Sequence, residues 1–313
     1  MSVHTKPSDL LKYRAHIAMC PPNFFEVSYS INPFMEPCKW VTDAQSYQMA
    51  SAHQWNNLTD TLTKLGVNIE ILQPHHGVPD LVFTANAAIV LDQKVLLARF
   101  RHPERQAEEP FFKAFFDMMK TRGFVTDVAS LPASIHQEGA GDCVWDAKRQ
   151  LFWAGYGPRS DMGASDYIRD YFGKPVVPLK LQTAQFYHLD VSMAPLSGGE
   201  MVYYPGAFSP ASVNQILDHV ADHHDLIEAT LEDASHLCVN AVNIGSDIVM
   251  APCSDRLRGQ LTERGYTLHE VPLGEFWKSG GAAFCLTLRL DRYSDGFIPG
   301  NKKVADLQVI ETV

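Results

Sequence analysis

The sequence lacks the features that mark secreted, zinc-binding and membrane proteins. Its six cysteines are scattered without a CxxC pair: Cys20, Cys38, Cys143, Cys238, Cys253 and Cys285. This spacing indicates reduced thiols and not a disulfide framework or a zinc knuckle. No apolar run approaches the length of a transmembrane helix, and the first 19 residues lack the long apolar segment of a signal peptide. We therefore expect a cytoplasmic protein without a membrane partner.

The sequence also has fewer basic than acidic residues. It contains 26 Lys and Arg and 36 Asp and Glu, which give a formal net charge of -10. An acidic chain is a poor partner for nucleic acid or an anionic membrane. No phosphate loop or dinucleotide fingerprint is present. The histidine pairs His75-His76 and His223-His224 are adjacent in loops and do not have the spacing of metal ligands. We expect no cofactor, no metal and a small-molecule substrate, and the sequence leaves open a homo-oligomer.

What the sequence does contain is ample core material and an internal repeat. Hydrophobic residues make up 46% of the 313 residues and charged residues 20%, which is typical of a folded protein. A strand–turn–strand–helix–strand pattern recurs every 50 residues or so. One polar or nucleophilic residue on the first strand marks each unit: Asn86, Asp142, His188, Asn240 and Cys285.

This repeat predicts the fold. Four-stranded propeller blades have a similar length but would not place an amphipathic helix in every unit. We therefore expect an α/β fold, a five-bladed β/α propeller of ββαβ units around a central channel. One domain would span residues 1–313. In such a ring the first strand of each unit lines the channel, so the five marker residues would converge on one site.

The stretch from Lys278 to Leu290, KSGGAAFCLTLRL, carries the strongest chemical signal. Gly280 and Gly281 let a backbone approach a ligand closely because they have no Cβ atom. The apolar residues that follow predict a short strand bedded in the core, with Cys285 at its mouth. A buried structural cysteine is the alternative interpretation of the same stretch.

Several segments together resemble the guanidino-group-modifying superfamily, whose members share the pentein fold. That superfamily includes arginine deiminases, dimethylarginine dimethylaminohydrolases and amidinotransferases. The resemblance covers nearly the whole chain and rests on the segments at residues 83–86 (FTAN), 100–105 (FRHPER), 138–142 (EGAGD), 157–159 (GPR), 188–189 (HL) and 280–285 (GGAAFC).

The chemistry of this superfamily suits these residue types. A guanidinium carbon is a poor electrophile, so a thiolate at Cys285 would attack it and form a covalent intermediate. Substrate charge or a protonated His188 would favour the thiolate. His188 would act as general acid and base, and Asp142 would orient the guanidinium. Glu138 would support either of them. Taken singly, His188 is equally readable as a core histidine and Asp142 as a turn residue.

The residue at position 86 departs from the relatives that resemble this chain, which usually carry a carboxylate there. A carboxylate only accepts hydrogen bonds, whereas the amide of Asn86 both donates and accepts. An amide could therefore hold arginine and afterwards the ureido oxygen of citrulline. Three arginines are candidates for the substrate carboxylate, with at most two of them in contact: Arg101, Arg105 and Arg159. By analogy with the dihydrolase branch, Asn32 in an early loop would close over the site.

The expected activity is hydrolysis of arginine or a close analogue. The amide at position 86 and the residues of the segments at 83–86 and 100–105 resemble those of the arginine dihydrolases most. Those enzymes form ornithine, carbon dioxide and two ammonia molecules. A deiminase or dimethylarginine dimethylaminohydrolase that stops at citrulline is the first alternative. An amidinotransferase, which passes the amidino group to an amine, is the second. A non-catalytic binder is the third, and retention of Cys285, His188 and Asp142 counts against it.

Overall fold

The computed structural model describes residues 15–299. The N-terminal segment considered for a leader lies mostly outside these residues, as do both ends of the expected 1–313 domain. Within residues 15–299 no helix combines the length and apolarity needed to cross a bilayer.

Five three-stranded sheets form the framework, and all five have the same pairing: the first strand is antiparallel to the central strand, which is parallel to the outer strand. The first strands are β3 (Ala88–Leu91), β6 (Cys143–Asp146), β9 (Met193–Pro195), β12 (Val242–Ile244) and β15 (Leu288–Arg289). The central strands are β4 (Lys94–Leu97), β7 (Leu151–Tyr156), β10 (Met201–Tyr203), β13 (Asp247–Met250) and β1 (His16–Met19). The outer strands are β5 (Asp127–Ser130), β8 (Val176–Lys180), β11 (Leu226–Glu228), β14 (Thr267–Glu270) and β2 (Asn68–Ile71).

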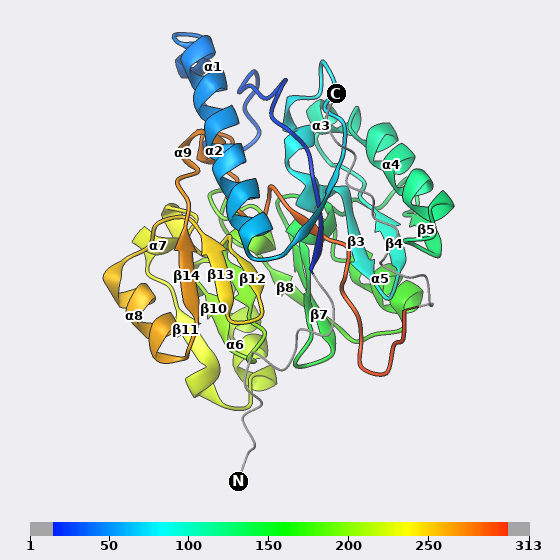
Figure 1. Ribbon diagram of the computed structural model, residues 1–313. Helices are drawn as coiled ribbons and strands as arrows, with labels where there is room; N and C mark the ends of the chain where they lie inside the picture. Colours follow the sequence, from blue (N-terminus) through cyan, green and yellow to red (C-terminus); the bar gives the residue numbers. More distant parts are fainter. Residues whose placement is uncertain (1–14, 300–313) are drawn as a thin grey trace.

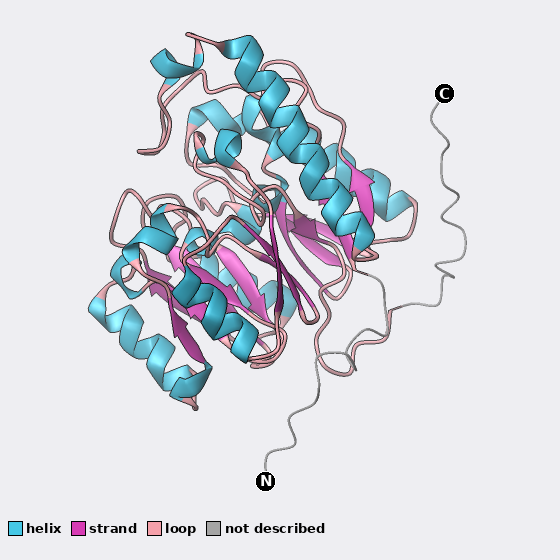
Figure 2. Ribbon diagram, turned by 60° about the vertical axis from the view of Figure 1, so that its left-hand side comes forward, coloured by secondary structure: helices cyan, strands magenta, loops and turns pink. Residues whose placement is uncertain are grey.

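Each central strand is joined to its parallel outer strand by a helical crossover, as parallel pairing requires. The crossovers contain α1 (Pro37–Trp40) with α2 (Ala44–Lys64), α3 (Pro103–Gln106) with α4 (Glu109–Thr121), α5 (Ala164–Phe172), α6 (Pro210–His219) and α8 (Asp255–Glu263). Two short helices, α7 (Leu231–Ser235) and α9 (Gly274–Trp277), follow outer strands. Figure 1 and Figure 2 show strands gathered inside the molecule and helices around them. The predicted ββαβ repeat is therefore present in all five sheets.

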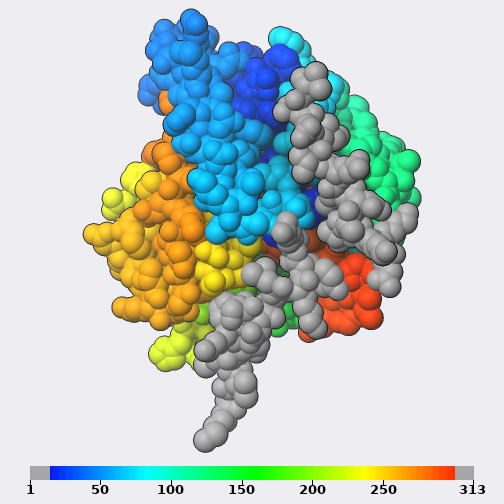
Figure 3. All heavy atoms as spheres, viewed as in Figure 1, coloured from blue at the N-terminus to red at the C-terminus, as the bar shows by residue number. Residues whose placement is uncertain are grey.

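The two ends of the described chain meet in one sheet. Its strand order is β15-β1-β2, so a C-terminal strand pairs with two N-terminal strands. Ala18 is opposite Leu288, and Leu290 N donates to His16 O over 2.8 Å. Helix α2, light blue in Figure 3, lies on the visible face of the molecule and contacts β2 and α9. This sheet completes the fifth unit only when both ends are in place.

The marker residues do not lie on the first strands, and this part of the prediction is wrong. Asn86 lies in a short 3-10 helix, η3 (Thr84–Ala87), ahead of β3. Asp142 follows η4 (Gly139–Gly141), and His188 precedes η5 (Leu189–Val191). Cys285 lies in a turn ahead of β15, closed by the bond from Leu286 N to Ala282 O at 3.2 Å.

A turn is needed because one side chain must reach backbone groups that a strand would separate. Asn240 Oδ1 accepts from both Ala282 N and Cys285 N, at 3.0 and 3.1 Å. Three residues of extended strand would hold these two N–H groups about 10 Å apart. The polar residue thus comes before each first strand, and the strand that follows supplies apolar packing.

Candidate active site

A narrow pocket lies where these turns meet, and we call it the Cys285 pocket. Its open space is about 10 Å³, which is room for about one water molecule. It is lined by Ile31, Asn32, Asp80, Phe83, Asn86, Arg105, Arg159, Tyr187, Ser279, Gly281 and Cys285. The sequence-predicted residues Cys285, Asn86, Arg105, Arg159 and Asn32 are therefore brought together. Arg101, Glu138, Asp142 and His188 are not among the lining residues.

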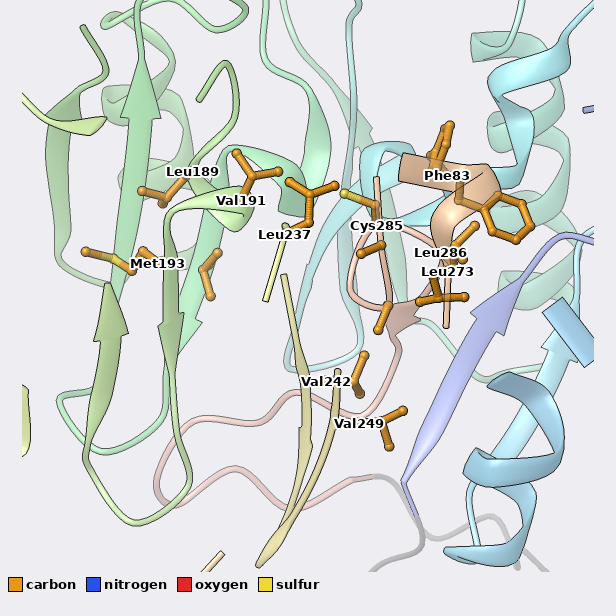
Figure 4. Packing of buried hydrophobic residues seen from close by; sticks show 14 of the residues in the cluster. Phe83, Leu189, Val191, Met193, Leu237, Val242, Val249, Leu273, Cys285 and Leu286 are labelled. Carbon is orange, nitrogen blue, oxygen red and sulfur yellow. The ribbon is translucent and has the colours of Figure 1, made fainter. Parts of the chain in front are cut away.

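The Cys285 thiol is held by two polar side chains from neighbouring turns. Asn240 Nδ2 donates to Cys285 Sγ over 3.1 Å, and the thiol lies 3.1 Å from Asp190 Oδ2. Cys285 is 2% exposed and packs in the main apolar core. Figure 4 shows it in this core with Leu237, Phe83 and Leu286 labelled around it. The thiol is thus fixed between an amide and a carboxyl group inside an otherwise apolar environment.

Burial keeps this thiol protonated in the free protein. Desolvation, followed by the nearby Asp190 carboxylate, holds the pKa of Cys285 well above its ordinary value. Burial likewise raises the pKa of Asp190 to about 7. The other oxygen, Asp190 Oδ1, is buried and has no hydrogen-bond partner among residues 15–299. An unpartnered buried acceptor costs free energy until a donor reaches it. The pair is therefore ready for a ligand that brings both positive charge and N–H groups.

His188 is bound to Glu138 on the side away from solvent. His188 Nε2 lies 2.8 Å from Glu138 Oε2, which also accepts from Arg159 Nη1 at 2.9 Å. Despite burial, the charge of Arg159 and the His188 contact lower the pKa of Glu138 below its usual range. Burial lowers the pKa of His188 to about 4, because Arg159 already compensates the Glu138 charge. In the free protein His188 is therefore a neutral imidazole that can accept a proton.

Asp142 connects two turns and does not face the Cys285 pocket. Asp142 Oδ2 accepts from Ser160 Oγ at 2.6 Å, and Oδ1 accepts from Leu189 N at 3.0 Å. Its Oδ2 atom is 4.0 Å from His188 Nε2. Burial raises the pKa of Asp142 well above its usual value. Asp142 therefore fixes the backbone of the residue next to His188.

The amide of Asn86 has a defined orientation. Its Oδ1 accepts from Arg105 Nη1 at 2.8 Å, and its Nδ2 donates to Glu138 O at 3.1 Å. Arg105 is in turn held by Glu108, which accepts from Nε and Nη2 at 2.8 and 2.7 Å. The carbonyl side of Asn86 is thus occupied, and its amide nitrogen keeps one N–H free for a ligand.

The other two arginines differ in exposure. Arg159 is buried, donates from Nη2 to Ile31 O over 3.1 Å, and stacks on Tyr187 at 4.6 Å. Arg101 pairs with Asp161, its side chain is 35% exposed, and its backbone N donates to Glu138 Oε1 over 3.2 Å. Arg101 thus positions Glu138 from behind, while Arg105 and Arg159 line the Cys285 pocket.

Asn32 joins the early loop to the turn that carries Cys285. Its Nδ2 donates to Ser279 O over 3.0 Å, and its Oδ1 accepts from Phe34 N at 2.9 Å. Asp80 lies on the same side, where its oxygens accept from Ser279 Oγ at 3.0 Å and from Tyr29 Oη at 2.8 Å. The early loop therefore lies against the turn that carries Cys285 and supplies Ile31 and Asn32 to the wall of the Cys285 pocket.

Sequence reasoning missed three residues of this site. Asp190 stands two residues after His188, and that spacing within one turn was an available signal. Asn240 marked the fourth repeat but was not assigned a role, although its side chain holds Cys285 at both Sγ and the backbone N. Asp80 carried no local signal, because its position depends on contacts with Tyr29 and Ser279 that are 51 and 199 residues away in sequence.

Comparisons with known proteins identify the relatives of this chain. The family model described as N,N dimethylarginine dimethylhydrolase, eukaryotic, matches residues 22–291. The N(G),N(G)-dimethylarginine dimethylaminohydrolase of Mycobacterium tuberculosis is 36% identical over 273 residues, which are 87% of this chain and 85% of that protein.

A second relative is the bifunctional arginine dihydrolase/ornithine cyclodeaminase ArgZ of Synechocystis. It is 42% identical over 274 residues, which are 88% of this chain but 37% of ArgZ. The chain thus spans less than two-fifths of the length of that relative. A crystal structure of the N-terminal domain of ArgZ bound to product has a TM-score of 0.83 and 41% identity, and the match covers 90% of this chain and 99% of that domain.

The matches confirm the resemblance to the guanidino-group-modifying superfamily and its pentein fold. Because the family model spans most of the described residues and the mycobacterial relative is matched over most of its length, the chain belongs to the N,N-dimethylarginine dimethylhydrolase family.

Proposed function

We propose that this protein hydrolyses the guanidino group of arginine and that it is an arginine dihydrolase. The observation that carries the proposal is the buried pair of Cys285 Sγ and Asp190. Asp190 Oδ1 has no donor among the described residues, although it lies in the same carboxyl group as the oxygen next to the thiol. A guanidinium is donor-only and cationic. It would therefore supply both an N–H donor for Asp190 Oδ1 and a positive charge beside the Cys285 thiol.

Substrate charge would activate the nucleophile. A neutral His188 cannot supply the positive charge that a thiolate needs, whereas a guanidinium bound to Asp190 can. Placing that cation beside Sγ lowers the pKa of the thiol. The thiolate of Cys285 then attacks the guanidinium carbon, and the bond to one terminal nitrogen breaks. His188 takes up the thiol proton and gives it to the departing ammonia. Water, deprotonated by His188, next releases citrulline from Sγ.

The amide of Asn86 supports a second round of hydrolysis. Its free N–H can donate to the ureido oxygen of citrulline, which a carboxylate at this position would repel. Attack of Cys285 Sγ on the ureido carbon then breaks the bond to the remaining terminal nitrogen and releases the second ammonia. Water hydrolyses the resulting thiocarbamate, and the carbamate of ornithine that leaves Sγ breaks down to ornithine and carbon dioxide. In balance, arginine and two water molecules give ornithine, carbon dioxide and two ammonia molecules.

Charged side chains suit the amino-acid end of the substrate. Arg159 and Arg105 are cations on the pocket wall, and Arg159 is the better candidate for the substrate carboxylate because Arg105 is engaged by Glu108 and Asn86. Asp80 would accept from the α-ammonium group. The open space of the Cys285 pocket is far smaller than arginine, so the loop that carries Asn32 would have to open for entry.

The proposal includes the remaining architecture. We infer that the five sheets close into a propeller around the Cys285 pocket, as one domain over residues 1–313. The identical pairing in all five sheets and the meeting of both chain ends in the sheet of β1 support closure. A cytoplasmic location is supported by six cysteines that are all free thiols.

Incubation with arginine tests the function. We expect ornithine and two equivalents of ammonia per arginine, consumption of citrulline supplied alone, and no dependence on an added amine. Cys285→Ala should lose at least about 10³-fold in turnover while the far-UV circular dichroism is retained. The control Cys253→Ala removes another partly buried thiol and should keep full activity. Accumulation of citrulline by the wild-type protein would contradict the dihydrolase reading.

A dimethylarginine dimethylaminohydrolase is the second candidate, favoured by the family model and by the name of the mycobacterial relative. The same thiol and Asp190 could act on a methylated guanidinium and stop at citrulline. Release of dimethylamine from asymmetric dimethylarginine, at a higher kcat/KM than ammonia from arginine, would replace the proposal by this one. A requirement for glycine or another amine would indicate an amidinotransferase.

A further inference from the structure

A second pocket lies behind the catalytic turns and has no lining residue in common with the Cys285 pocket. We call it the Arg292 pocket. It is lined by Ile89, Val90, Ala140, Cys143, Val144, Trp145, Phe152, Phe284, Leu288, Arg289 and Arg292. Its open space is about 20 Å³, enough for about one small ion or water molecule. Most of its wall is apolar strand surface from β3, β6 and β15. The side chains with N–H groups in this lining belong to two arginines and one tryptophan.

Arg292 is a cation without an acceptor. Among residues 15–299 its guanidinium makes no hydrogen bond or ion pair, in contrast to the neighbouring Arg289. Arg289, for example, donates from Nε and Nη2 to Asp291 over 2.7 Å and from Nη1 to Asn243 O over 2.9 Å. The pocket therefore contains a cation whose N–H groups have no acceptor among the described residues.

The carboxylates of Asp291 and Asp146 favour the charge of Arg292 but accept no hydrogen bond from it. Asp291 is occupied by Arg289, and Asp146 accepts from Arg149 Nη1 at 2.8 Å and from Trp153 Nε1 at 3.0 Å. Burial, and then the charge of Arg289, lower the pKa of Arg292 to about 9. A cation in this position is stabilised by a counter-ion that the described residues do not provide.

Trp145 gives an independent sign of a missing acceptor. Its Nε1 is buried and has no hydrogen-bond partner among the described residues, in contrast to Trp153, whose Nε1 is satisfied by Asp146. The Trp145 ring is fixed edge-on against Phe152, with centroids 4.9 Å apart. The residues that carry these two donors, one charged and one neutral, thus both line one small cavity.

The segment that carries Arg292 is also fixed in place. Asp92, in the turn between β3 and β4, donates from its backbone N to Arg292 O over 2.9 Å. The Asp92 carboxylate accepts from Ser294 N and Ser294 Oγ, both at 2.7 Å. Arg292 is therefore held from both sides and does not need a bound ligand to be positioned.

From these observations we infer that the Arg292 pocket binds a small monoanion, of the size of chloride or formate, between Arg292 and Trp145 Nε1. The anion lies against the back of the catalytic turns, because Ala140 is between Glu138 and Asp142 and Phe284 precedes Cys285. Binding would neutralise Arg292 and accept from the Trp145 ring. Its expected effect is stabilisation of the folded protein, and it is independent of the proposed activity.

Chloride is the probe for the thermal experiment. Melting temperatures are measured at constant ionic strength while chloride replaces gluconate, an anion too large for the pocket. We expect a saturable rise of about 2–4 °C for the wild-type protein. Arg292→Gln should lose this rise. Trp145→Phe removes only one donor and should raise the half-saturating chloride concentration by about tenfold.

The control is Arg169→Gln, which removes an exposed arginine of α5 that pairs with Asp166 and Asp170 and should keep the full response. Bromide locates the bound anion. Anomalous scattering from crystals grown in bromide should show a peak between Arg292 and Trp145. An equal chloride response in wild type and Arg292→Gln overturns the inference. So does the absence of bromide from the pocket, and this second readout stands even if a variant fails to fold.

Discussion

At the scale of single residues, burial decides which groups near Cys285 carry a charge. Cys285 and Asp190 are both buried, and burial disfavours the charged form of each, while the Asp190 carboxylate further disfavours the Cys285 thiolate. The free protein thus carries a neutral thiol, which is protected from oxidation and alkylation because the thiolate is the reactive form. A bound cation would offset the Asp190 charge, so we expect the reactivity of the thiol to depend on ligand binding.

This coupling predicts how Cys285 reacts with iodoacetamide. Because its pKa is raised, labelling in the free protein should be slow at pH 7 and rise about tenfold per pH unit up to pH 9. Asp190→Asn removes a negative charge and should speed labelling several-fold at pH 8.5. Peptide mapping by mass spectrometry measures the rate, with exposed Cys38 in the same sample as the control for reagent activity. Slower labelling in Asp190→Asn would mean that Asp190 does not restrain the thiolate.

Asn86 is the residue that we expect to decide whether the reaction stops after one round of hydrolysis or continues to a second. In Asn86→Asp the oxygen that replaces Nδ2 faces Glu138 O, which now lies 3.1 Å from the amide nitrogen. A repulsive buried contact costs about 1–3 kcal/mol, and the same oxygen repels the ureido group. The second step should therefore slow by about ten- to a hundredfold, and citrulline should accumulate. Chromatography of citrulline and ornithine over time measures this.

Asn243→Asp is the matched control for that experiment. Asn243 Nδ2 also donates to backbone carbonyls, of Gly245 and Asp247, at 2.9 and 3.0 Å, but it lies on β12 and away from the Cys285 pocket. It should lose a similar amount of stability without accumulating citrulline. Equal accumulation in both variants would show a general effect of lost stability.

At the scale of elements, the turn between α9 and β15 is shaped by two glycines. Gly280 has a φ of +88°, and Gly281 passes so close to Phe83 that a Cβ atom would lie 2.5 Å from its Cε1 and 3.0 Å from Cys285 Cβ. The position of Phe83 is fixed in turn by Phe25, with ring centroids 5.9 Å apart. The turn is therefore closely packed on the side where it presents the thiol.

Gly281→Ala should push Phe83 and Cys285 apart. We expect a loss of about 1–3 kcal/mol in the free energy of unfolding, from overpacking, and about a hundredfold loss of kcat, because a shift of about 1 Å in the thiol misaligns the attack. Urea denaturation and steady-state rates measure the two effects. Gly274→Ala, whose Cβ atom would meet nothing within 4 Å, should change neither. Normal turnover in Gly281→Ala would mean that the turn tolerates displacement.

The sequence predicted the order of elements well and the position of the polar residues less well. Helical periodicity and glycine punctuation are local properties, so the ββαβ repeat was recognisable. The strands assigned to Asn86 and Cys285 are turns because the apolar runs around them look the same in either conformation. What separates the two cases is a long-range hydrogen bond, such as the one from Cys285 N to Asn240 Oδ1 across 45 residues.

The site shows the same division. Cys285, Asn86, Arg105 and Arg159 were predicted from residue type and spacing, and the pocket includes them all. The role of Asp142 toward the substrate stays a prediction. Its contacts with Ser160 Oγ and Leu189 N could not be predicted, because neither residue is near Asp142 in sequence.

For the whole molecule, the joining of the two chain ends makes catalysis depend on a very short strand. Strand β15 has two residues, Leu288 and Arg289. Among residues 15–299, these are the residues through which the segment that carries Cys285 pairs with β1. Leu288 is 2% exposed and packs in a cluster with Ala88 and Val90 of β3. Local opening of so short an element costs less than global unfolding. Since Cys285 is three residues away, activity should be lost when β15 detaches.

Leu288→Ala tests this dependence. Truncating a buried leucine costs about 2–5 kcal/mol, and here the loss should fall mainly on the attachment of β15. We expect activity to disappear several degrees below the midpoint of unfolding, as followed by circular dichroism at 222 nm, whereas the two transitions coincide in the wild-type protein. Leu261→Ala is the control, because Leu261 is 1% exposed on α8 and packs in a different cluster. It should lower the midpoint by a similar amount and leave the two transitions together. If activity and structure are lost together in Leu288→Ala as well, the β15 sheet opens only with the whole molecule, and the chain ends are joined more firmly than two paired residues suggest.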